Sequence, residues 1–161
     1  MLKIRPAVAS DAATLRSLIL GLAEYEKLTH LVKITEEDLL RDGFGPAPRF
    51  RCLIAEWDGQ PVGYALFFYN YSTFLGHAGI YLEDLFVWPE LRGRGIGKAL
   101  LLKVAKIAVD EGCTRYEWQV LDWNQPSIDF YESMGASLSK QWIPVRAEGE
   151  VLAEMARKSR D

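Results

Sequence analysis

A turn rich in glycine and basic residues is the segment of this sequence best suited to chemistry. It runs from Leu91 to Lys98, between an expected strand and an expected helix. Glycine has no Cβ, so its backbone can turn tightly and approach a ligand closely. Successive N–H groups at the start of a helix bind phosphate oxygens. The turn therefore predicts a pyrophosphate site, made of Arg92, Gly93, Arg94, Gly95, Ile96, Gly97 and Lys98.

Two common nucleotide-binding motifs do not fit this turn. A Walker A loop needs glycine at position 92 and serine or threonine at position 99, where the chain has Arg92 and Ala99. A dinucleotide fingerprint that starts at Gly93 needs glycine where Lys98 stands. The remaining alternative is a glycine turn with solvated arginines. Three basic residues in an otherwise acidic chain, placed between a strand and a helix, favour the phosphate site.

Adjacent carboxylates, Glu83 and Asp84, interrupt an apolar strand expected from Ile80 to Trp88. Alkyl ammonium groups have a pKa near 10.4, so an amine must lose a proton before it can attack a carbonyl group. A carboxylate can accept that proton, directly or through a water. Neighbouring strand residues face opposite sides, so only one of the two should enter a given cleft. The alternative is a structural ion pair or a charge at the sheet edge.

Tyr131 is the candidate proton donor. It lies in an expected helix that begins near Asn124, and its phenol can donate a proton to a departing thiolate. Alternatively, Ile128, Tyr131 and Met134 form one core-facing stripe, because they recur at three-residue spacing.

Other catalytic chemistries find little support. The two histidines, His30 and His77, have no motif spacing to Cys52 or Cys113, so a covalent acyl-cysteine route is not expected. The same residues form no metal-binding constellation, and we expect no metal. Cysteines in apolar segments, such as Cys52 and Cys113, are more often small buried core residues than nucleophiles.

The pattern Arg92-x-x-Gly95-x-Gly97 after a strand resembles the acetyl-CoA-binding motif of the GNAT superfamily of N-acetyltransferases. The resemblance covers nearly the whole chain, and more narrowly it matches the diamine (spermidine/spermine) and thialysine acetyltransferase branch. The segments that carry this narrower likeness are Leu22–Leu28, Asp42–Gly45, Tyr81–Asp84 and Asp122–Asn124. The resemblance implies acetyl-CoA as the acyl donor and direct attack by the amine within a ternary complex.

The resemblance also implies roles for particular residues. Glu83 would assist deprotonation and hold the amine, and Tyr131 would be the general acid. The acceptor pocket would contain Tyr25, Glu26, Glu83 and Asp84. Contacts to the coenzyme, besides the glycine turn, would come from Leu85, Phe86, Val87, Asn124, Ser127 and Tyr131. Asn124 is also expected to cap its helix.

The acceptor is expected to be a small cation. Six acids against three bases lie between Glu24 and Asp42, an excess that attracts amines, although solvated helix faces would look the same. The polyamine enzymes that the chain resembles place an acidic residue and glycine before a tryptophan, whereas this chain has Lys140-Gln141-Trp142. That departure disfavours long polyamines and leaves thialysine-like amino acids or other small amines. Two other functions stay open: acetylation of a protein N-terminus or lysine, and non-catalytic sensing of acyl-CoA.

These residues need a mixed α/β scaffold. Apolar periodicity predicts strands at 3–5, 50–57, 62–71, 80–88 and 115–121, and helices from Ser10-Asp11, from Thr35, over 96–111 and over 124–134. Ser10-Asp11 is expected to cap the first helix, Thr35 to start the second with acids in its first turn, and Asp58-Gly59 to form a tight turn between two strands. Two final strands are expected near Ser137–Ile143 and Glu150–Met155. The order predicts one α/β domain over 1–161, and the resemblance implies a mixed, mostly antiparallel sheet flanked by helices.

Composition limits the partners. The chain has 161 residues, 49% of them hydrophobic, and a formal net charge of −3. With a pI near 5.5, it is not expected to bind nucleic acid or anionic membranes. Two cysteines and the lack of a signal peptide or spanning segment predict a cytoplasmic protein. The resemblance implies a homodimer in which strands near the C-terminus meet the partner. The apolar residues Trp142, Ile143 and Val145 could complete that surface, or they could equally belong to core strands.

Overall fold

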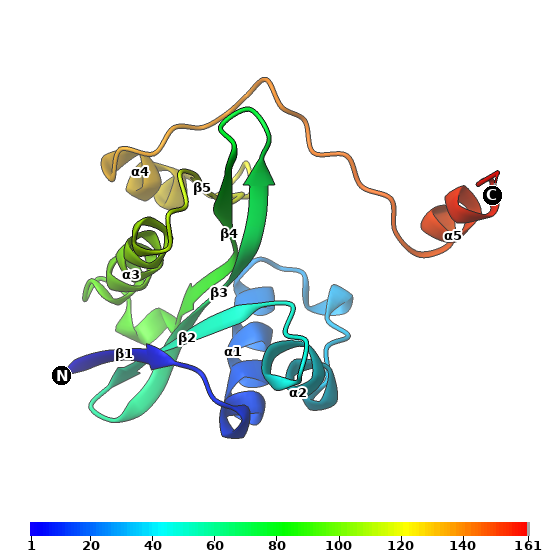
Figure 1. Ribbon diagram of the computed structural model, residues 1–161. Helices are drawn as coiled ribbons and strands as arrows, with labels where there is room; N and C mark the ends of the chain where they lie inside the picture. Colours follow the sequence, from blue (N-terminus) through cyan, green and yellow to red (C-terminus); the bar gives the residue numbers. More distant parts are fainter. Residues whose placement is uncertain (161) are drawn as a thin grey trace. The chain divides into compact units, whose positions relative to one another are not determined.

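The computed structural model describes residues 1–160, and the chain divides into two compact units, residues 1–121 and residues from 122 onward. The first unit is built on a five-stranded sheet in the order β1-β2-β3-β4-β5 (Figure 1). Its strands are β1 (Leu2–Pro6), β2 (Arg51–Trp57), β3 (Gln60–Ser72), β4 (His77–Val87) and β5 (Tyr116–Glu117). Neighbours pair antiparallel except β4 with β5, which are parallel. The expected mixed, mostly antiparallel α/β fold is confirmed.

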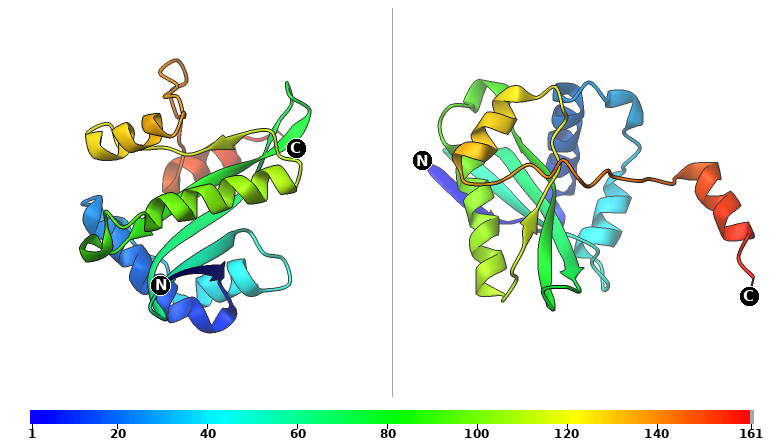
Figure 2. Two further views of the ribbon diagram at one scale, coloured as in Figure 1. Left: turned by 90° about the vertical axis from the view of Figure 1, so that its left-hand side faces the viewer. Right: turned by 90° about the horizontal axis from the view of Figure 1, so that it is seen from above.

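Helices cover both faces of this sheet. The helices α1 (Ala12–Tyr25) and α2 (Glu36–Phe44) lie on one face, and α3 (Ile96–Asp110) lies on the other (Figure 2). Short 3₁₀ turns complete the unit at Ala9–Asp11, Thr29–Leu31 and Pro89–Leu91. The core beneath α1 and α2 consists of fully or nearly buried side chains: Ala12, Leu15, Leu18, Leu39, Cys52, Ile54, Tyr64, Leu66 and Phe86.

Local sequence signals explain most of these boundaries. Thr35 caps α2, because its Oγ1 accepts from the Asp38 N–H at 3.1 Å while Asp38 Oδ2 accepts from the Thr35 N–H at 3.0 Å. Asp58 and Gly59 both adopt positive φ in the tight β2–β3 turn, as their types predicted. The expected helices over 96–111 and from Thr35 are confirmed.

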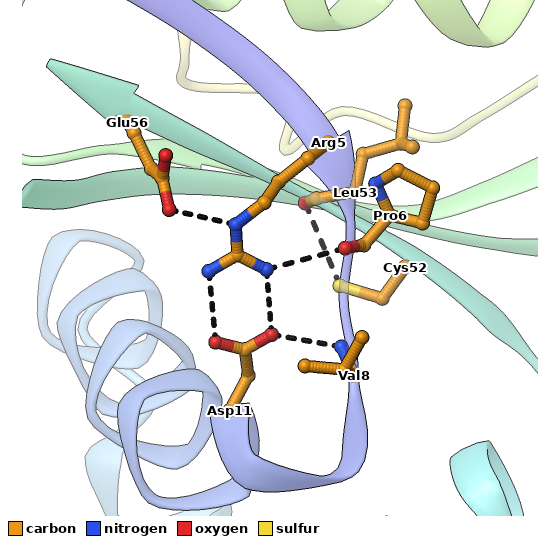
Figure 3. Close-up of polar contacts among 7 residues, drawn as sticks. All are labelled: Arg5, Pro6, Val8, Asp11, Cys52, Leu53 and Glu56. Carbon is orange, nitrogen blue, oxygen red and sulfur yellow. Dashed lines mark hydrogen bonds and ion pairs between the residues drawn. The ribbon is translucent and has the colours of Figure 1, made fainter. Parts of the chain in front are cut away.

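Asp11 does not act as the simple helix cap that the sequence predicted. Its carboxylate instead accepts two hydrogen bonds from Arg5, at 2.7 and 3.0 Å, and one from the Val8 N–H at 2.8 Å (Figure 3). The Arg5 Nε also donates to Glu56 at 2.6 Å. Arg5 holds the pKa of Asp11 below its usual range. This network joins β1, β2 and the start of α1. Asp11 is only 8% exposed, and these hydrogen bonds compensate its buried charge.

The second unit contains α4 (Gln125–Ser133) and α5 (Gly149–Arg157). The helix expected from Asn124 is confirmed, but both expected C-terminal strands are wrong. Residues 137–143 have no regular structure, and the segment expected as a strand at Glu150–Met155 is helical. The apolar residues Val151, Leu152 and Met155 fit helical spacing as well as strand alternation, and Arg157 supports the helix through ion pairs to Glu150 and Glu154.

The expected strand at 115–121 is also shorter than predicted, because β5 consists of Tyr116 and Glu117 alone. Among residues 1–160, no helix is both long and apolar enough to cross a membrane.

Candidate active site

The glycine turn has the backbone geometry of an anion site. Gly93 and Gly95 have φ values of +76° and +79°, which residues with a Cβ rarely adopt. Open space surrounds both, since a Cβ added at either would meet nothing within 4 Å. Gly95 is the residue before α3, so the first N–H groups of that helix, from Ile96 to Lys98, have no partner within the helix. Their positive end and the open turn suit a diphosphate.

The two arginines of the turn stand on aromatic rings. The Arg92 guanidinium lies 4.2 Å from the centre of the Tyr25 ring and 5.5 Å from that of Phe86. Its Nε donates to the Val87 carbonyl at 3.0 Å. Arg94 lies 5.4 Å from the centre of the Trp57 ring. These cation–π contacts fix the direction of each charge before any ligand binds.

The strand that leads into this turn has an open edge. Strand β4 pairs with β5 at two positions, Ile80 with Tyr116 and Tyr81 with Glu117. Among residues 1–160, no strand continues that pairing along Leu82–Val87, while the other edge of β4 pairs with β3 as far as Val87. An open strand edge presents backbone N–H and C=O groups to a ligand that carries amides. The amide-containing arm of coenzyme A fits this edge, and its diphosphate fits the turn.

Glu83 occupies a β-bulge in β4. Leu66 of β3 pairs with Asp84, and the next residue, Phe67, pairs with Leu82, so Glu83 is the extra residue. Bulges interrupt the regular alternation of side chains and often lie beside active sites. The simple alternation expected for Glu83 and Asp84 therefore does not hold. Glu83 is exposed and Asp84 is partly buried.

Asp84 is bound to the hydroxyl group of Tyr64, which donates to Oδ2 at 2.8 Å. Tyr64 is completely buried in β3. Burial raises the pKa of Asp84 to about 6; the Tyr64 hydrogen bond opposes this rise, and the nearby charges of Glu83 and Glu26 add to it. Asp84 is therefore a carboxyl group that changes charge just below neutral pH.

Glu26, directly after α1, completes a cluster of three carboxylates. Burial raises its pKa, and the charge of Glu83 raises it further. Because these acids destabilise one another as anions, a bound cation would relieve their repulsion. The structure thus brings together Glu26, Glu83 and Asp84, all of which the sequence predicted for the acceptor pocket. Tyr25, the fourth predicted residue, lies beside them in the chain with its ring against Arg92.

Three further predicted residues lie in the second unit. Asn124 is buried and precedes α4, where its Oδ1 accepts from the Ser127 N–H at 3.4 Å, so the expected helix cap is confirmed. Tyr131 lies within α4, with its ring centre 5.5 Å from that of Phe130. Their roles toward coenzyme and substrate stay predictions.

The sequence did not single out Tyr64, Gly21 or Trp88, which shape the site. A phenol within an apolar strand was the available signal for Tyr64, because a buried hydroxyl needs a partner. A Cβ at Gly21 would lie 2.4 Å from the Trp88 ring, so this glycine lets α1 approach the end of β4. Glycine within a helix signals such close packing.

Comparisons with known proteins show the family to which this chain belongs. The model of the acetyltransferase (GNAT) family matches residues 17–136. The chain belongs to the GNAT acetyltransferase family. This GNAT enzyme is 45% identical to the thialysine N-epsilon-acetyltransferase of Sus scrofa, over 96% of this chain and 97% of the relative. It is 38% identical to spermidine/spermine N(1)-acetyltransferase-like protein 1 of Homo sapiens, over 96% of this chain and 24% of the relative.

A solved structure shows the same GNAT fold. An integron cassette protein from the mobile metagenome of V. cholerae superposes with a TM-score of 0.82 at 26% identity, covering 98% of both chains. The predicted family, fold and enzyme class are therefore confirmed: the chain is an N-acetyltransferase.

Proposed function

We propose that this enzyme transfers the acetyl group of acetyl-CoA to a primary amine of a small cationic acceptor. Thialysine-like amino acids and short diamines are the acceptors that we favour. The observation that carries this proposal is the carboxylate cluster formed by Glu26, at the end of α1, with Glu83 and Asp84, on the strand that leads into the glycine turn. The names of the relatives, which act on thialysine or resemble a polyamine enzyme, support the same substrate class.

Residues of this chain would hold the donor as follows. The N–H groups of residues 93–98 and the charges of Arg92, Arg94 and Lys98 bind the diphosphate. The open edge of Leu85–Val87 binds the amides of the pantetheine arm, and Asn124 and Ser127 contribute further contacts. The coenzyme supplies a thioester, whose carbonyl group is open to attack by an amine.

The acceptor is held and deprotonated by carboxylates. Glu26 and Asp84 attract the ammonium group, and Glu83 accepts, directly or through a water, the proton that this group must lose before the nitrogen can attack. As the N–C bond forms, the nitrogen releases its second proton to water. Tyr131 donates a proton to the sulfur as the C–S bond breaks. Proton transfer by a positioned group accelerates a reaction by roughly 10²- to 10⁴-fold, so each of the two residues is worth testing.

A panel of amines tests the proposal. Purified protein is mixed with acetyl-CoA and with thialysine, ornithine, putrescine, spermidine or a lysine-containing peptide, and the released thiol is measured. We expect rapid release with thialysine, ornithine or putrescine and slower release with spermidine, because Lys140 stands where an acid would hold a distal amine. Glu83→Gln should lower the rate, whereas Glu90→Gln, on the short 3₁₀ turn after β4, is the matched control.

Two outcomes would overturn the proposal. Release with the peptide alone would assign a protein acetyltransferase. Coenzyme binding without thiol release in the presence of any amine would assign an acyl-CoA sensor.

We further propose a single domain over residues 1–161, a cytoplasmic location and a homodimer. A monomeric mass at micromolar concentration in analytical ultracentrifugation would refute the dimer.

A further inference from the structure

The guanidinium of Arg92 is held in place on three sides. The rings of Tyr25 and Phe86 lie 4.2 and 5.5 Å from it, and its Nε donates to the last carbonyl of β4 at 3.0 Å. These contacts use its faces and one of its five N–H donors, and the other four are on the Nη atoms. A guanidinium fixed in this way is ready for bidentate binding of phosphate.

The position of Tyr25 is set one helical turn earlier. Gly21 and Tyr25 are four residues apart, so they share one face of α1. A Cβ at Gly21 would lie 2.4 Å from the Trp88 ring and 2.9 Å from the Phe86 ring. Phe86 and Trp88 themselves pack edge to face, with ring centres 5.1 Å apart. The end of α1 therefore rests directly on the residues that flank the phosphate-binding turn.

The residue after Tyr25, Glu26, is assigned to the amine site. Glu26 follows Tyr25 directly, and the charge of Glu83 raises its pKa. Position 26 keeps a helical conformation, with φ −81° and ψ −3°, so the two residues move with one helix end. One short segment thus contacts the arginine assigned to the coenzyme and supplies a carboxylate assigned to the amine.

We infer that Tyr25 is a positioning residue that couples the two substrate sites: stacked on Arg92, it fixes the helix end that carries Glu26. Hydrogen bonds from the Nη atoms of Arg92 to a diphosphate strengthen this existing stack, so the ring on its face and the adjacent carboxylate lose their remaining motion. Less conformational entropy is then lost when the amine binds, so bound coenzyme strengthens amine binding without a change of fold. The inference rests on the proposed function, because it assigns the two neighbouring sites to coenzyme and amine.

Calorimetry with coenzyme A and ornithine tests the coupling, since coenzyme A lacks an acetyl group and no turnover occurs. The measured quantity is the ratio of the ornithine Kd without and with saturating coenzyme A. We expect a ratio of at least about 5 for the wild type, within the usual range for coupled sites. Tyr25→Leu should reduce the ratio to below about 2. Tyr25→Phe keeps the ring and should retain most of it.

Trp57→Leu is the matched control. Trp57 stacks on Arg94 of the same turn, 5.4 Å from the guanidinium, but is not part of α1. This variant should weaken coenzyme A binding a few-fold and leave the ratio unchanged. If Tyr25→Leu does not fold, Arg92→Gln disrupts the same stack from the other side and should also reduce the ratio.

An unchanged ratio in Tyr25→Leu, or in Arg92→Gln where that variant replaces it, would overturn the inference. A ratio of 1 in the wild type, or an equal loss in Trp57→Leu, would do the same. Failure of the proposed function would look different: the wild type would not bind coenzyme A, or would release no thiol with any amine of the panel.

Discussion

Replacing Asp84 by asparagine should stabilise the protein at neutral pH while it impairs the reaction. Asparagine has nearly the same shape and can still accept the Tyr64 hydrogen bond, but it carries no charge to bury. Asp84 has a pKa of about 6 in the folded chain against a reference value of 3.8. One pKa unit corresponds to 1.36 kcal/mol, so ionised Asp84 destabilises the fold by about 3 kcal/mol.

The sign follows from proton binding. Between pH 4 and 6 the folded protein holds a proton on Asp84 that the unfolded chain has lost, so stability falls as pH rises through this window. Below pH 4 the carboxyl group is neutral in both states. The difference in stability between Asp84→Asn and the wild type should therefore be near zero at pH 4, grow up to pH 6, and stay constant above it.

Urea unfolding of both proteins at pH 4, 5, 6 and 7.5 measures this difference. Titrating groups that do not interact with Asp84 are present in both proteins and cancel to first order. Tyr64→Phe is the companion variant: it removes the hydrogen bond that favours ionised Asp84, so the destabilising window should extend to higher pH. A difference that does not depend on pH would refute the assignment of a buried, titrating carboxyl group. In activity assays, Asp84→Asn should raise the KM for ornithine roughly tenfold, as expected for a lost charged hydrogen bond.

Three further outcomes are expected. Tyr131→Phe should slow thiol release by roughly 10- to 10⁴-fold while calorimetry shows near-normal coenzyme A binding; unchanged turnover would remove its role as general acid. Gly95→Ala should weaken coenzyme A binding and cost about 1–2 kcal/mol of stability, because φ is +79° there; equal affinity for coenzyme A would contradict the phosphate site. Asp11→Asn should destabilise the fold by about 3 kcal/mol, since it leaves Arg5 without its bidentate partner. Because Arg5 lowers the pKa of Asp11, urea unfolding should show this loss at neutral pH and none in strong acid. The change in stability has the opposite sign to that of Asp84→Asn.

The sequence predicted those parts of the fold that local rules determine. The periodicity of α1 and α3, the Thr35 cap and the Asp58-Gly59 turn each depend on neighbouring residues, and each is found where expected. The glycine turn between β4 and α3 is local in the same sense, so its conformation could be read from residue types. The family resemblance added the expectation of a mixed, mostly antiparallel sheet flanked by helices.

Features that depend on distant residues were missed. The bulge at Glu83 is a shift of register between β3 and β4, which neither strand shows alone. Asp11 was expected to cap a helix. Its carboxylate instead binds Arg5 of β1, six residues earlier, and the residues next to Asp11 do not indicate that contact. The C-terminal segment Glu150–Met155 was assigned the wrong element, because its apolar spacing fits two periods. In the site, Tyr64 was overlooked since its hydroxyl group finds a carboxylate twenty residues further along the chain.

The unpaired edge of β4 has a consequence for handling the protein. Without bound acetyl-CoA, residues 82–87 present a row of backbone N–H and C=O groups with which another extended chain could pair. Purification steps that strip this ligand away should therefore favour self-association through β4. Adding acetyl-CoA to storage buffers is expected to keep the preparation dispersed, because the ligand would take the place of the missing neighbour.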